Sequence, residues 1–139
     1  MAEEQPSKGV WEIDPKLAER YRRHAGERGY HFSTFEWLAA RDPEFEKARL
    51  PLVEATYLRQ DPALPVKYKE LIAATILAFR GYPSVGKHLK RALEAGASVQ
   101  EVIEALEIAS IPGGMPTLHF GIDQLIELEC EHPELFETS

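Results

Sequence analysis

The sequence predicts an all-α fold of about six to seven helices, and three observations predict it. Apolar residues recur at helical spacing over several long segments. Helix-start signals of the Asp-Pro or Ser-x-x-Glu type precede most of these segments, and Gly or Pro follows them. No run of alternating β-branched residues is convincing as a strand. The sheet content is therefore expected to be close to nil.

Length and charge restrict the function classes. The chain has 139 residues, which is enough for one domain with a core of its own. Its formal charge of −7 argues against a nucleic-acid or anionic-membrane partner, since either needs clustered Lys and Arg. No segment approaches the roughly 18 apolar residues of a membrane span. The polar, acidic N-terminus lacks the pattern of a secretory signal, so we expect a cytoplasmic protein.

The first sixty residues predict three helices after a loose arm of about ten residues. Asp14-Pro15 starts the first helix, which ends before Gly29. One face of this helix carries Leu17, Tyr21 and His24. Ser33-Thr34-Phe35-Glu36 is a capping box that opens a short second helix. Asp42-Pro43 starts a third helix, which we expect to reach about Arg59.

Residues 64–95 predict a helical hairpin. Its first helix begins near Val66, its second begins near Ser84, and Arg80-Gly81-Tyr82-Pro83 joins them. Gly96 is expected to end the second helix as a left-handed cap. One apolar face of the first helix consists of Leu71, Ile72, Thr75, Ile76 and Phe79. Glu70 lies next to this face and is therefore not obviously on the solvated side.

Two further helices are predicted after the hairpin. Ser98-Val99-Gln100-Glu101 is a second capping box, so the sixth helix covers Val99 to about Ile111 and ends at Pro112-Gly113-Gly114. Its apolar positions are Val102, Ile103, Leu106, Ile108 and Ala109. A face this wide predicts a well-buried helix. The seventh helix starts around Pro116 and ends before Pro133.

Glu70 and His88 are the candidate catalytic residues of the hairpin. A carboxyl group and an imidazole on adjacent, apolar-backed helices can converge on one pocket, and this combination suits proton transfer. The alternative is a buried hairpin that carries two satisfied polar residues. The residues alone leave both interpretations open.

An ordered set of motifs in the second half of the chain resembles a known family. Lys67-x-x-Glu70-Leu71-Ile72 is followed by His88, then by Glu94-Ala95-Gly96-Ala97, then by Gly113-Gly114-x-Pro116. This order is similar to the carboxymuconolactone decarboxylase family, which includes the alkylhydroperoxidase D-like proteins. The resemblance covers roughly residues 64–128.

The resemblance implies an alkylhydroperoxidase D-like bundle of antiparallel helices that assembles as a homotrimer or homohexamer, with sites near subunit interfaces. We expect residues 1–139 to be a single domain, with N-terminal helices over 1–60 and the family-like core over 61–132. The first sixty residues resemble no family that we identify.

The chain departs from the peroxidase-like branch of the family at the hairpin turn. That branch carries a Cys-x-x-Cys pair before the histidine, and here Gly81 and Ser84 occupy those places. Cys130 is far along the last helix with no second cysteine. Serine cannot cycle between thiolate and disulfide, so thiol peroxidase activity is effectively excluded. The lactone decarboxylase branch also lacks the pair and keeps the histidine, and we expect no cofactor.

The resemblance suggests roles for the candidate residues. Decarboxylation of an unsaturated lactone requires a group that places the substrate carboxylates, a donor at the lactone carbonyl and an acid that protonates carbon. His88 can supply the donor or acid, because an imidazole exchanges protons near neutrality. Glu70 can orient it or carry the proton itself. The substrate-binding candidates are Arg80, Tyr82, Ser84, Lys87 and His119.

Simpler interpretations accompany each candidate. Glu70 could pair with a lysine, Arg80 and Lys87 could be solvated helix ends, and turn chemistry explains Ser84. A metal set of Glu70, His88 and His119 has no helical ligand spacing, so no metal is predicted. The remaining histidines are expected on the surface or at caps: His24, His31 and His132.

The sequence therefore predicts a small-molecule lyase. Its expected substrate is a small carboxylated lactone or aromatic-derived compound, and its expected chemistry is acid–base. The first alternative is a non-catalytic oligomeric binding or scaffold protein of the same fold. A weaker alternative is a peroxidase-like activity that depends on the thiol of a partner.

Overall fold

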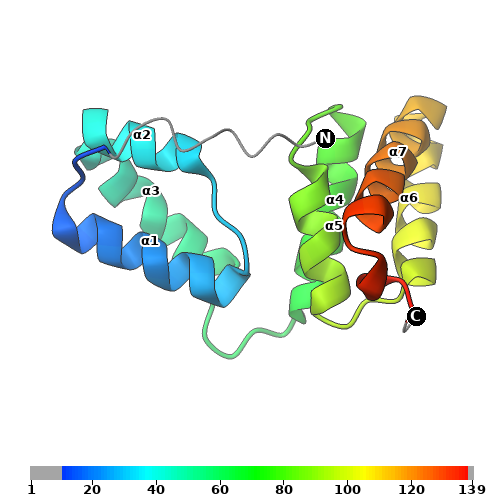
Figure 1. Ribbon diagram of the computed structural model, residues 1–139, viewed down its shortest axis with the longest axis horizontal. Helices are drawn as coiled ribbons and strands as arrows, with labels where there is room; N and C mark the ends of the chain where they lie inside the picture. The colour runs from blue at the N-terminus through cyan, green and yellow to red at the C-terminus, as the bar shows by residue number, and fades with distance from the viewer. Residues whose placement is uncertain (1–10, 138–139) are drawn as a thin grey trace. The chain divides into compact units, whose positions relative to one another are not determined.

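The computed structural model describes residues 11–137, and the predicted N-terminal arm lies outside them. Within these residues the chain forms seven α-helices and one short 3₁₀-helix, η1, with no strand, which confirms the all-α prediction (Figure 1). The helices are α1 (Pro15–Arg28), α2 (Ser33–Arg41), α3 (Pro43–Thr56), α4 (Val66–Phe79), α5 (Val85–Glu94), α6 (Val99–Gly113), α7 (Met115–Glu131) and η1 (Pro133–Leu135).

The chain divides into two compact units. The N-terminal unit extends to residue 62 and contains α1 to α3, and the C-terminal unit begins at residue 63 and contains α4 to η1. Each unit has its own group of buried apolar residues. The predicted single domain stays a prediction, and each unit is considered by itself.

The N-terminal unit starts each of its two longer helices with an aspartate cap. The Asp14 carboxylate accepts from the backbone N–H of Lys16 at 2.9 Å, and Asp42 accepts from that of Phe45 at 3.2 Å. Gly29 ends α1 with a φ of 78°, a left-handed conformation that favours glycine. The buried core of this unit consists of Leu17, Tyr21, Ala39 and Leu50.

Two predictions for the N-terminal unit are wrong in detail. Phe32, not Ser33, is the N-cap of α2, and no side chain caps this helix. Because Ser33 already lies inside the helix, the predicted capping box does not form, and Glu36 lies 3.4 Å from His31 Nε2. Helix α3 ends at Thr56, three residues before Arg59, where the N–H of Leu58 bonds back to the carbonyl of Val53.

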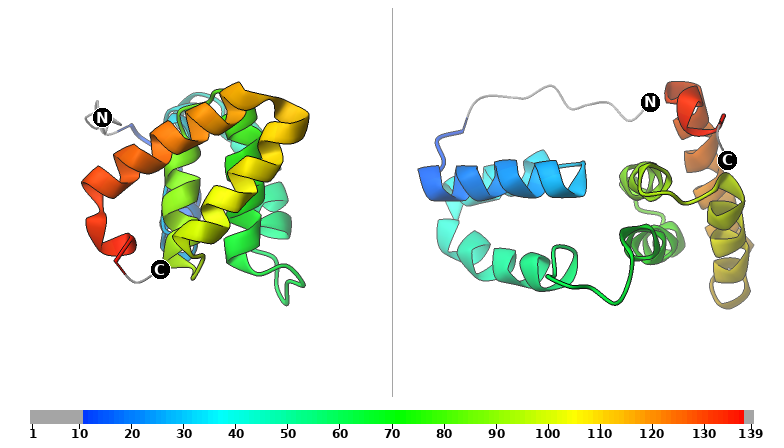
Figure 2. Two further views of the ribbon diagram at one scale, coloured as in Figure 1. Left: turned by 90° about the vertical axis from the view of Figure 1, so that its right-hand side faces the viewer. Right: turned by 90° about the horizontal axis from the view of Figure 1, so that it is seen from below.

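The C-terminal unit packs the α4–α5 hairpin against α6 and α7 (Figures 1 and 2). Gly81 has a φ of 63° in the predicted turn between α4 and α5. Helices α6 and α7 approach each other closely at Gly121 of α7, where any other residue would place its Cβ 2.4 Å from Leu106 of α6. The fully buried core residues include Val85, Leu89, Ala92, Val102 and Leu106.

The predicted caps of α5 and α6 are confirmed. Gly96 follows α5 with a φ of 100°, and the N–H of Ala97 bonds to the carbonyl of Ala92. Ser98 Oγ accepts from the N–H of Glu101 at 3.0 Å, while the Glu101 carboxylate accepts from the N–H of Ser98 at 3.2 Å. Helix α6 continues through Pro112 to Gly113, slightly beyond its predicted end.

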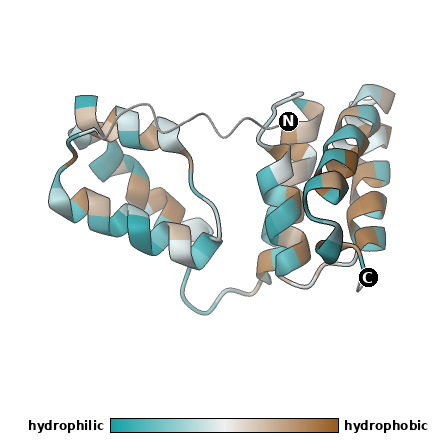
Figure 3. Ribbon diagram, viewed as in Figure 1, coloured by the Kyte–Doolittle hydropathy of each residue, from teal (hydrophilic) through white to brown (hydrophobic). Residues whose placement is uncertain are grey.

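The broad apolar faces of α4 and α6 are only partly buried. In α6 the core-facing residues are Val102, Leu106 and Ser110, whereas Ile108 and Ile111 are 72% and 81% exposed. The prediction of a well-buried α6 is therefore wrong for a single chain. In α4 the core face is Glu70, Leu71, Ala74 and Ala78, and the exposed apolar residues are Ile72, Ile76 and Phe79. Figure 3 shows hydrophobic residues recurring along α6.

Candidate functional site

The structure brings Glu70 and His88 into direct contact. Glu70 is the fifth residue of α4, His88 is the fourth residue of α5, and His88 Nδ1 lies 2.7 Å from Glu70 Oε2. Glu70 is 2% exposed and His88 is 5% exposed. The two candidate catalytic residues therefore form one buried carboxyl–imidazole pair.

Helical spacing places both residues on core-facing sides. Glu70 shares its face with Leu71 and Ala74, and His88 shares its face with Leu89 and Ala92. His88 Nδ1 faces the Glu70 carboxyl group, so Nε2 lies on the other side of the ring. An ionised carboxyl group only accepts hydrogen bonds, and in that state the contact requires the proton on Nδ1 and leaves Nε2 of a neutral ring as the basic nitrogen.

The α4–α5 turn does not lie beside Glu70. Arg80 follows Glu70 by ten residues, which corresponds to about 15 Å along a helix axis. Arg80 and Tyr82 are both exposed. Ser84 is half-buried and precedes His88 by four residues, about one helical turn, and Lys87 is exposed beside His88 in the sequence. Ser84 and Lys87 are therefore closer candidates for substrate contact than Arg80 and Tyr82.

His119 does not join the pair. It is the fifth residue of α7 and is exposed, and no hydrogen bond or ion pair links it to Glu70 or His88. Over residues 11–137, no group of three or more His, Cys, Asp and Glu side chains is arranged to hold a metal ion. The metal set considered from the sequence is thus not assembled. Cys130 is a free, exposed cysteine.

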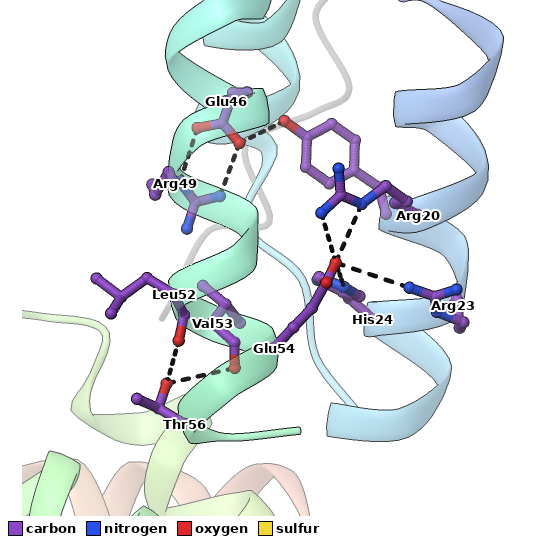
Figure 4. Close-up of polar contacts among 10 residues, drawn as sticks. Arg20, Arg23, His24, Glu46, Arg49, Leu52, Val53, Glu54 and Thr56 are labelled. Atoms are coloured by element: carbon purple, nitrogen blue, oxygen red, sulfur yellow. Dashed lines mark hydrogen bonds and ion pairs between the residues drawn. The ribbon is translucent and has the colours of Figure 1, made fainter. Parts of the chain in front are cut away.

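A second buried carboxylate lies in the N-terminal unit and was not predicted (Figure 4). Glu46 is fully buried, with Tyr21 Oη 2.6 Å from its Oε2. Arg49 donates to the same carboxylate from Nε at 2.7 Å and from Nη2 at 2.8 Å. Burial alone would raise the pKa of Glu46, but the hydrogen bonds from Arg49 and Tyr21 outweigh it and lower the pKa. Burial, and then Glu46, raise the pKa of Tyr21.

His24 is buried, so its predicted place on the surface or at a cap is wrong. It occupies the inner face of α1, with Nε2 3.1 Å from Glu54 Oε1 (Figure 4). Arg20 donates to the same oxygen at 2.6 Å from Nη2. Burial lowers the pKa of His24, and the contact with Glu54 opposes this only in part. The His24 site therefore favours the neutral imidazole.

The spacing of Glu46 and Glu54 along α3 could have indicated that both carboxylates face the core of the N-terminal unit. Glu46 and Glu54 stand four residues on either side of Leu50, so all three share one face of the helix. Tyr21 and His24 are three residues apart on α1. Of the other histidines, His31 is half-buried beside Glu36, and His132 follows α7 as its C-cap with Nδ1 3.2 Å from Glu134.

Comparison with known proteins defines the class. The sequence profile of the carboxymuconolactone decarboxylase family matches residues 43–124, more than half of the chain. The protein therefore belongs to this family. The match contains Glu70 and His88, and it begins at α3, earlier than the predicted boundary at residue 64.

One similar structure is the crystal structure of a candidate carboxymuconolactone decarboxylase from Burkholderia xenovorans LB400. The two proteins are 26% identical with a TM-score of 0.68, and the similarity covers 85% of this chain and 94% of the other. No curated protein matches this sequence. The predicted fold family is thus confirmed, and at the family level a decarboxylase-like role is supported. No helix within the described part of the chain is long and apolar enough to cross a membrane.

Proposed function

We propose that this protein is a decarboxylase-type lyase that acts on a small carboxylated lactone or a related aromatic-derived compound. The observation that carries the proposal is the buried hydrogen bond between His88 and Glu70, which lies within the segment that matches the family. The chemistry is acid–base and uses no redox cysteines, because Gly81 and Ser84 occupy the hairpin turn and Cys130 is the single cysteine of the chain.

The proposed reaction exchanges carbon dioxide for a proton. The bond between the substrate carbon and its carboxylate breaks, and its electron pair enters the conjugated lactone. Negative charge then develops on the lactone carbonyl oxygen, where a hydrogen-bond donor stabilises it. His88 delivers a proton to carbon, and Glu70 holds the ring and stabilises the protonated imidazole before the transfer. A proton from solvent restores His88.

Substrate placement requires a cation or a hydrogen-bond donor close to His88. Ser84 and Lys87, which share α5 or its first turn with His88, are the proposed contacts for the substrate carboxylates. Arg80, Tyr82 and His119 are exposed and farther from His88 in the sequence, and they are second candidates. The small exposed fractions of Glu70 and His88 require neighbouring side chains to move when a substrate enters.

The test is release of carbon dioxide from carboxymuconolactone by the purified full chain. We expect turnover by the wild type and a loss of about 100-fold or more in His88→Gln, which cannot shuttle a proton. The matched control is His132→Gln, which alters a histidine at the C-cap of α7, outside the proposed substrate contacts, and should retain activity. Absence of turnover by the wild type would refute this substrate, and full activity in His88→Gln would refute the role of the pair.

A non-catalytic scaffold is the second candidate, and the burial of the pair favours it. Glu70 and His88 bond to each other and expose little surface, as a structural ion pair would. On this alternative, Glu70→Gln and His88→Gln lower the free energy of unfolding, while carboxymuconolactone changes neither the melting temperature nor the NMR spectrum of the wild type. A saturable shift of His88 ring signals by the lactone would exclude a purely structural role.

We also propose that the chain assembles with copies of itself, as a homotrimer or homohexamer. Exposed apolar residues run along α4 at Ile72, Ile76 and Phe79, and along α6 at Ile108 and Ile111. The two stripes lie close together where α4 and α6 end, because a Cβ at Gly113 of α6 would lie 3.0 Å from the ring of Phe79 of α4. A monomer rarely exposes so many large apolar side chains close together.

Light scattering coupled to size exclusion tests this assembly. The wild type should elute with the mass of three or six chains, and the double variant Ile76→Glu, Ile108→Glu should have the mass of one. Glu104→Gln, at an exposed position of α6, is the control and should leave the mass unchanged. A monomeric wild type would show that the apolar stripes are covered by another protein or by the rest of the same chain.

A further inference from the structure

The α4–α5 hairpin carries a positive charge within an acidic protein. Residues 66–94 contain six Lys and Arg against two Glu, whereas the whole chain has a formal charge of −7. The buried pair of Glu70 and His88 belongs to this hairpin. Such a distribution of charge attracts an anionic ligand to the helices that hold the pair. The six cationic residues are Lys67, Lys69, Arg80, Lys87, Lys90 and Arg91.

Arg91 lies on the same side of α5 as His88. The two residues are three positions apart, and Ser84 precedes His88 by four, so all three follow one side of the helix. Ser84 and Arg91 are both half-buried. Arg91 Nη1 lies 3.7 Å from a carboxylate oxygen of Glu94, which is longer than a hydrogen bond. A substrate carboxylate that forms charge-assisted hydrogen bonds with the guanidinium can replace a contact of this kind.

Lys69 brings a second cation to the same end of the pair from α4. It directly precedes Glu70, and Ala73 follows the two residues by four and three positions, so both border one strip of α4. Lys69 is half-buried. Because α4 and α5 form an antiparallel hairpin (Figures 1 and 2), residues before Glu70 lie beside residues after His88. Lys69 and Arg91 therefore lie on facing helices at one end of the pair.

The opposite end of the pair is neutral. Ala73 follows Glu70 by about one turn of α4, and Ser84 precedes His88 by about one turn of α5. Both side chains are small and neither carries a charge. Loss of carbon dioxide turns a carboxylate into a neutral molecule, so cations that bind the leaving carboxylate stabilise the ground state and oppose the reaction. The cationic end therefore suits the carboxylate that a substrate keeps, and the neutral end suits the one that leaves.

We propose that Lys69 and Arg91 bind the carboxylate that the substrate keeps, while the leaving carboxylate faces Ser84. This inference rests on the proposed lyase function and adds two residues to its substrate contacts. Arg91 offers paired N–H groups that match the two oxygens of a carboxylate, and Lys69 adds a second charge from the facing helix. The site is then selective for dicarboxylates, because a monocarboxylate occupies only one end. Neither cation moves the proton, so both are binding residues.

The test compares the binding of adipate with that of its monoamide, which has the same length but only one carboxylate. NMR titration of the full-length protein at constant ionic strength follows the ring signals of His88. We expect the wild type to bind adipate at least about tenfold more tightly than the monoamide. This preference should fall below about twofold in the double variant Lys69→Gln, Arg91→Gln. Lys90→Gln is the matched control and should keep the preference, because Lys90 is a half-buried cation of α5 two positions from His88, on a different side of the helix.

Single variants keep the result decisive if the double variant fails to fold. Lys69→Gln alone should lower the adipate preference at least about threefold, and Arg91→Lys, which keeps the charge, should retain most of it. With carboxymuconolactone, Lys69→Gln should raise KM and leave kcat within about threefold of the wild type, because the retained carboxylate is bound equally in the ground state and the transition state.

The outcomes separate this inference from the lyase function. No adipate preference in the wild type, or an unchanged preference in Lys69→Gln and in the double variant, would overturn the inference even if carbon dioxide is released. A wild type that prefers adipate through these two cations but releases no carbon dioxide would support the dicarboxylate site and refute the lyase function.

Discussion

Both units of this protein bury a glutamate against partners, but the partners differ. In the N-terminal unit Glu46 accepts two hydrogen bonds from an arginine and one from a tyrosine. In the C-terminal unit Glu70 faces the imidazole of His88. Arginine stays charged at any pH that a protein survives, whereas an imidazole gains and loses a proton near neutrality. The first arrangement suits a fixed charge pair and the second suits proton transfer.

This difference predicts unequal roles for the two glutamates. Removing Glu46 should affect folding, because it leaves an arginine and a tyrosine hydroxyl without their acceptor in a buried place. Altering Glu70 should affect chemistry more than folding. The predictions below test the comparison, beginning with the largest expected effect.

Glu46→Ala should lower the free energy of unfolding by about 3 kcal/mol, because it breaks a buried charge pair and leaves a cavity. Chemical denaturation measures the loss, and hydrogen exchange should locate it in residues 11–62. Glu44→Gln, an exposed glutamate of the same helix that pairs with Lys47, should change the value by less than about 1 kcal/mol. A loss below about 1 kcal/mol in Glu46→Ala would mean that the network is not structural.

Glu70→Gln should reduce kcat for the lyase reaction by about 100-fold while changing the free energy of unfolding by only about 1 kcal/mol. The amide keeps the volume of the side chain but cannot stabilise a protonated His88 as a carboxylate does. Steady-state kinetics and denaturation of the same preparation supply both values. If kcat is unchanged while the free energy of unfolding falls, the pair of Glu70 and His88 is structural, and Glu70 has the same role as Glu46.

Acid should destabilise the N-terminal unit in two stages. The pKa of His24 is lowered by burial, so the unfolded chain binds this proton more readily and stability falls as the pH decreases below 6.5. The pKa values of Glu46 and Glu54 are also lowered, despite their burial, by hydrogen bonds from Arg49 and Arg20, so a second loss follows below pH 4.5. In both stages the free energy of unfolding decreases as the pH falls.

Hydrogen exchange of residues 11–62 as a function of pH measures this dependence. His24→Gln should remove the first stage and leave the second, because the amide does not titrate. An unchanged pH dependence between 6.5 and 4.5 in this variant would show that another group is responsible.

Local signals predicted much of the fold. Asp14, Asp42, Gly96 and the Ser98–Glu101 pair mark helix ends in the sequence and do so in the structure, because caps depend on residues within one turn of each other. Burial was harder to predict. Ile108 has the apolarity of a core residue, yet within one chain the helices that pack on α6 contact its opposite face.

The contact between the two candidate catalytic residues was easier to anticipate than the contacts of the N-terminal unit. Glu70 and His88 lie on the two helices of one hairpin, so the sequence could place them on adjacent helices, but only the structure shows that they meet. The Glu46 and Glu54 contacts join α3 to α1 across 25 and 30 residues, and nothing local specifies which polar residues of two helices will meet. A small cavity of the N-terminal unit is lined by side chains of α1, α2, α3 and the segment between α1 and α2, and no sequence pattern indicates it.

The smallest expected effects compare the two Ser-x-x-Glu patterns of the chain. Ser98→Ala should lower the free energy of unfolding by about 1 kcal/mol, because Ser98 Oγ accepts from the N–H of Glu101 at the start of α6. Ser33→Ala should change it by less than about 0.5 kcal/mol, because α2 has no side-chain cap and Ser33 is an exposed position inside it.

Thermal or chemical denaturation of both variants resolves this pair of values. Each substitution removes one hydroxyl at one end of a helix, so the difference between them isolates the capping hydrogen bond from the change in side-chain size. Equal losses in the two variants would mean that Ser33 caps α2 in solution, and the N-terminal unit would then begin its second helix as the sequence pattern predicts. A loss confined to Ser98→Ala would show that the same four-residue pattern caps α6 but not α2. The reason is the position of the serine: Ser98 is itself the extended N-cap residue of α6, whereas the N-cap residue of α2 is Phe32.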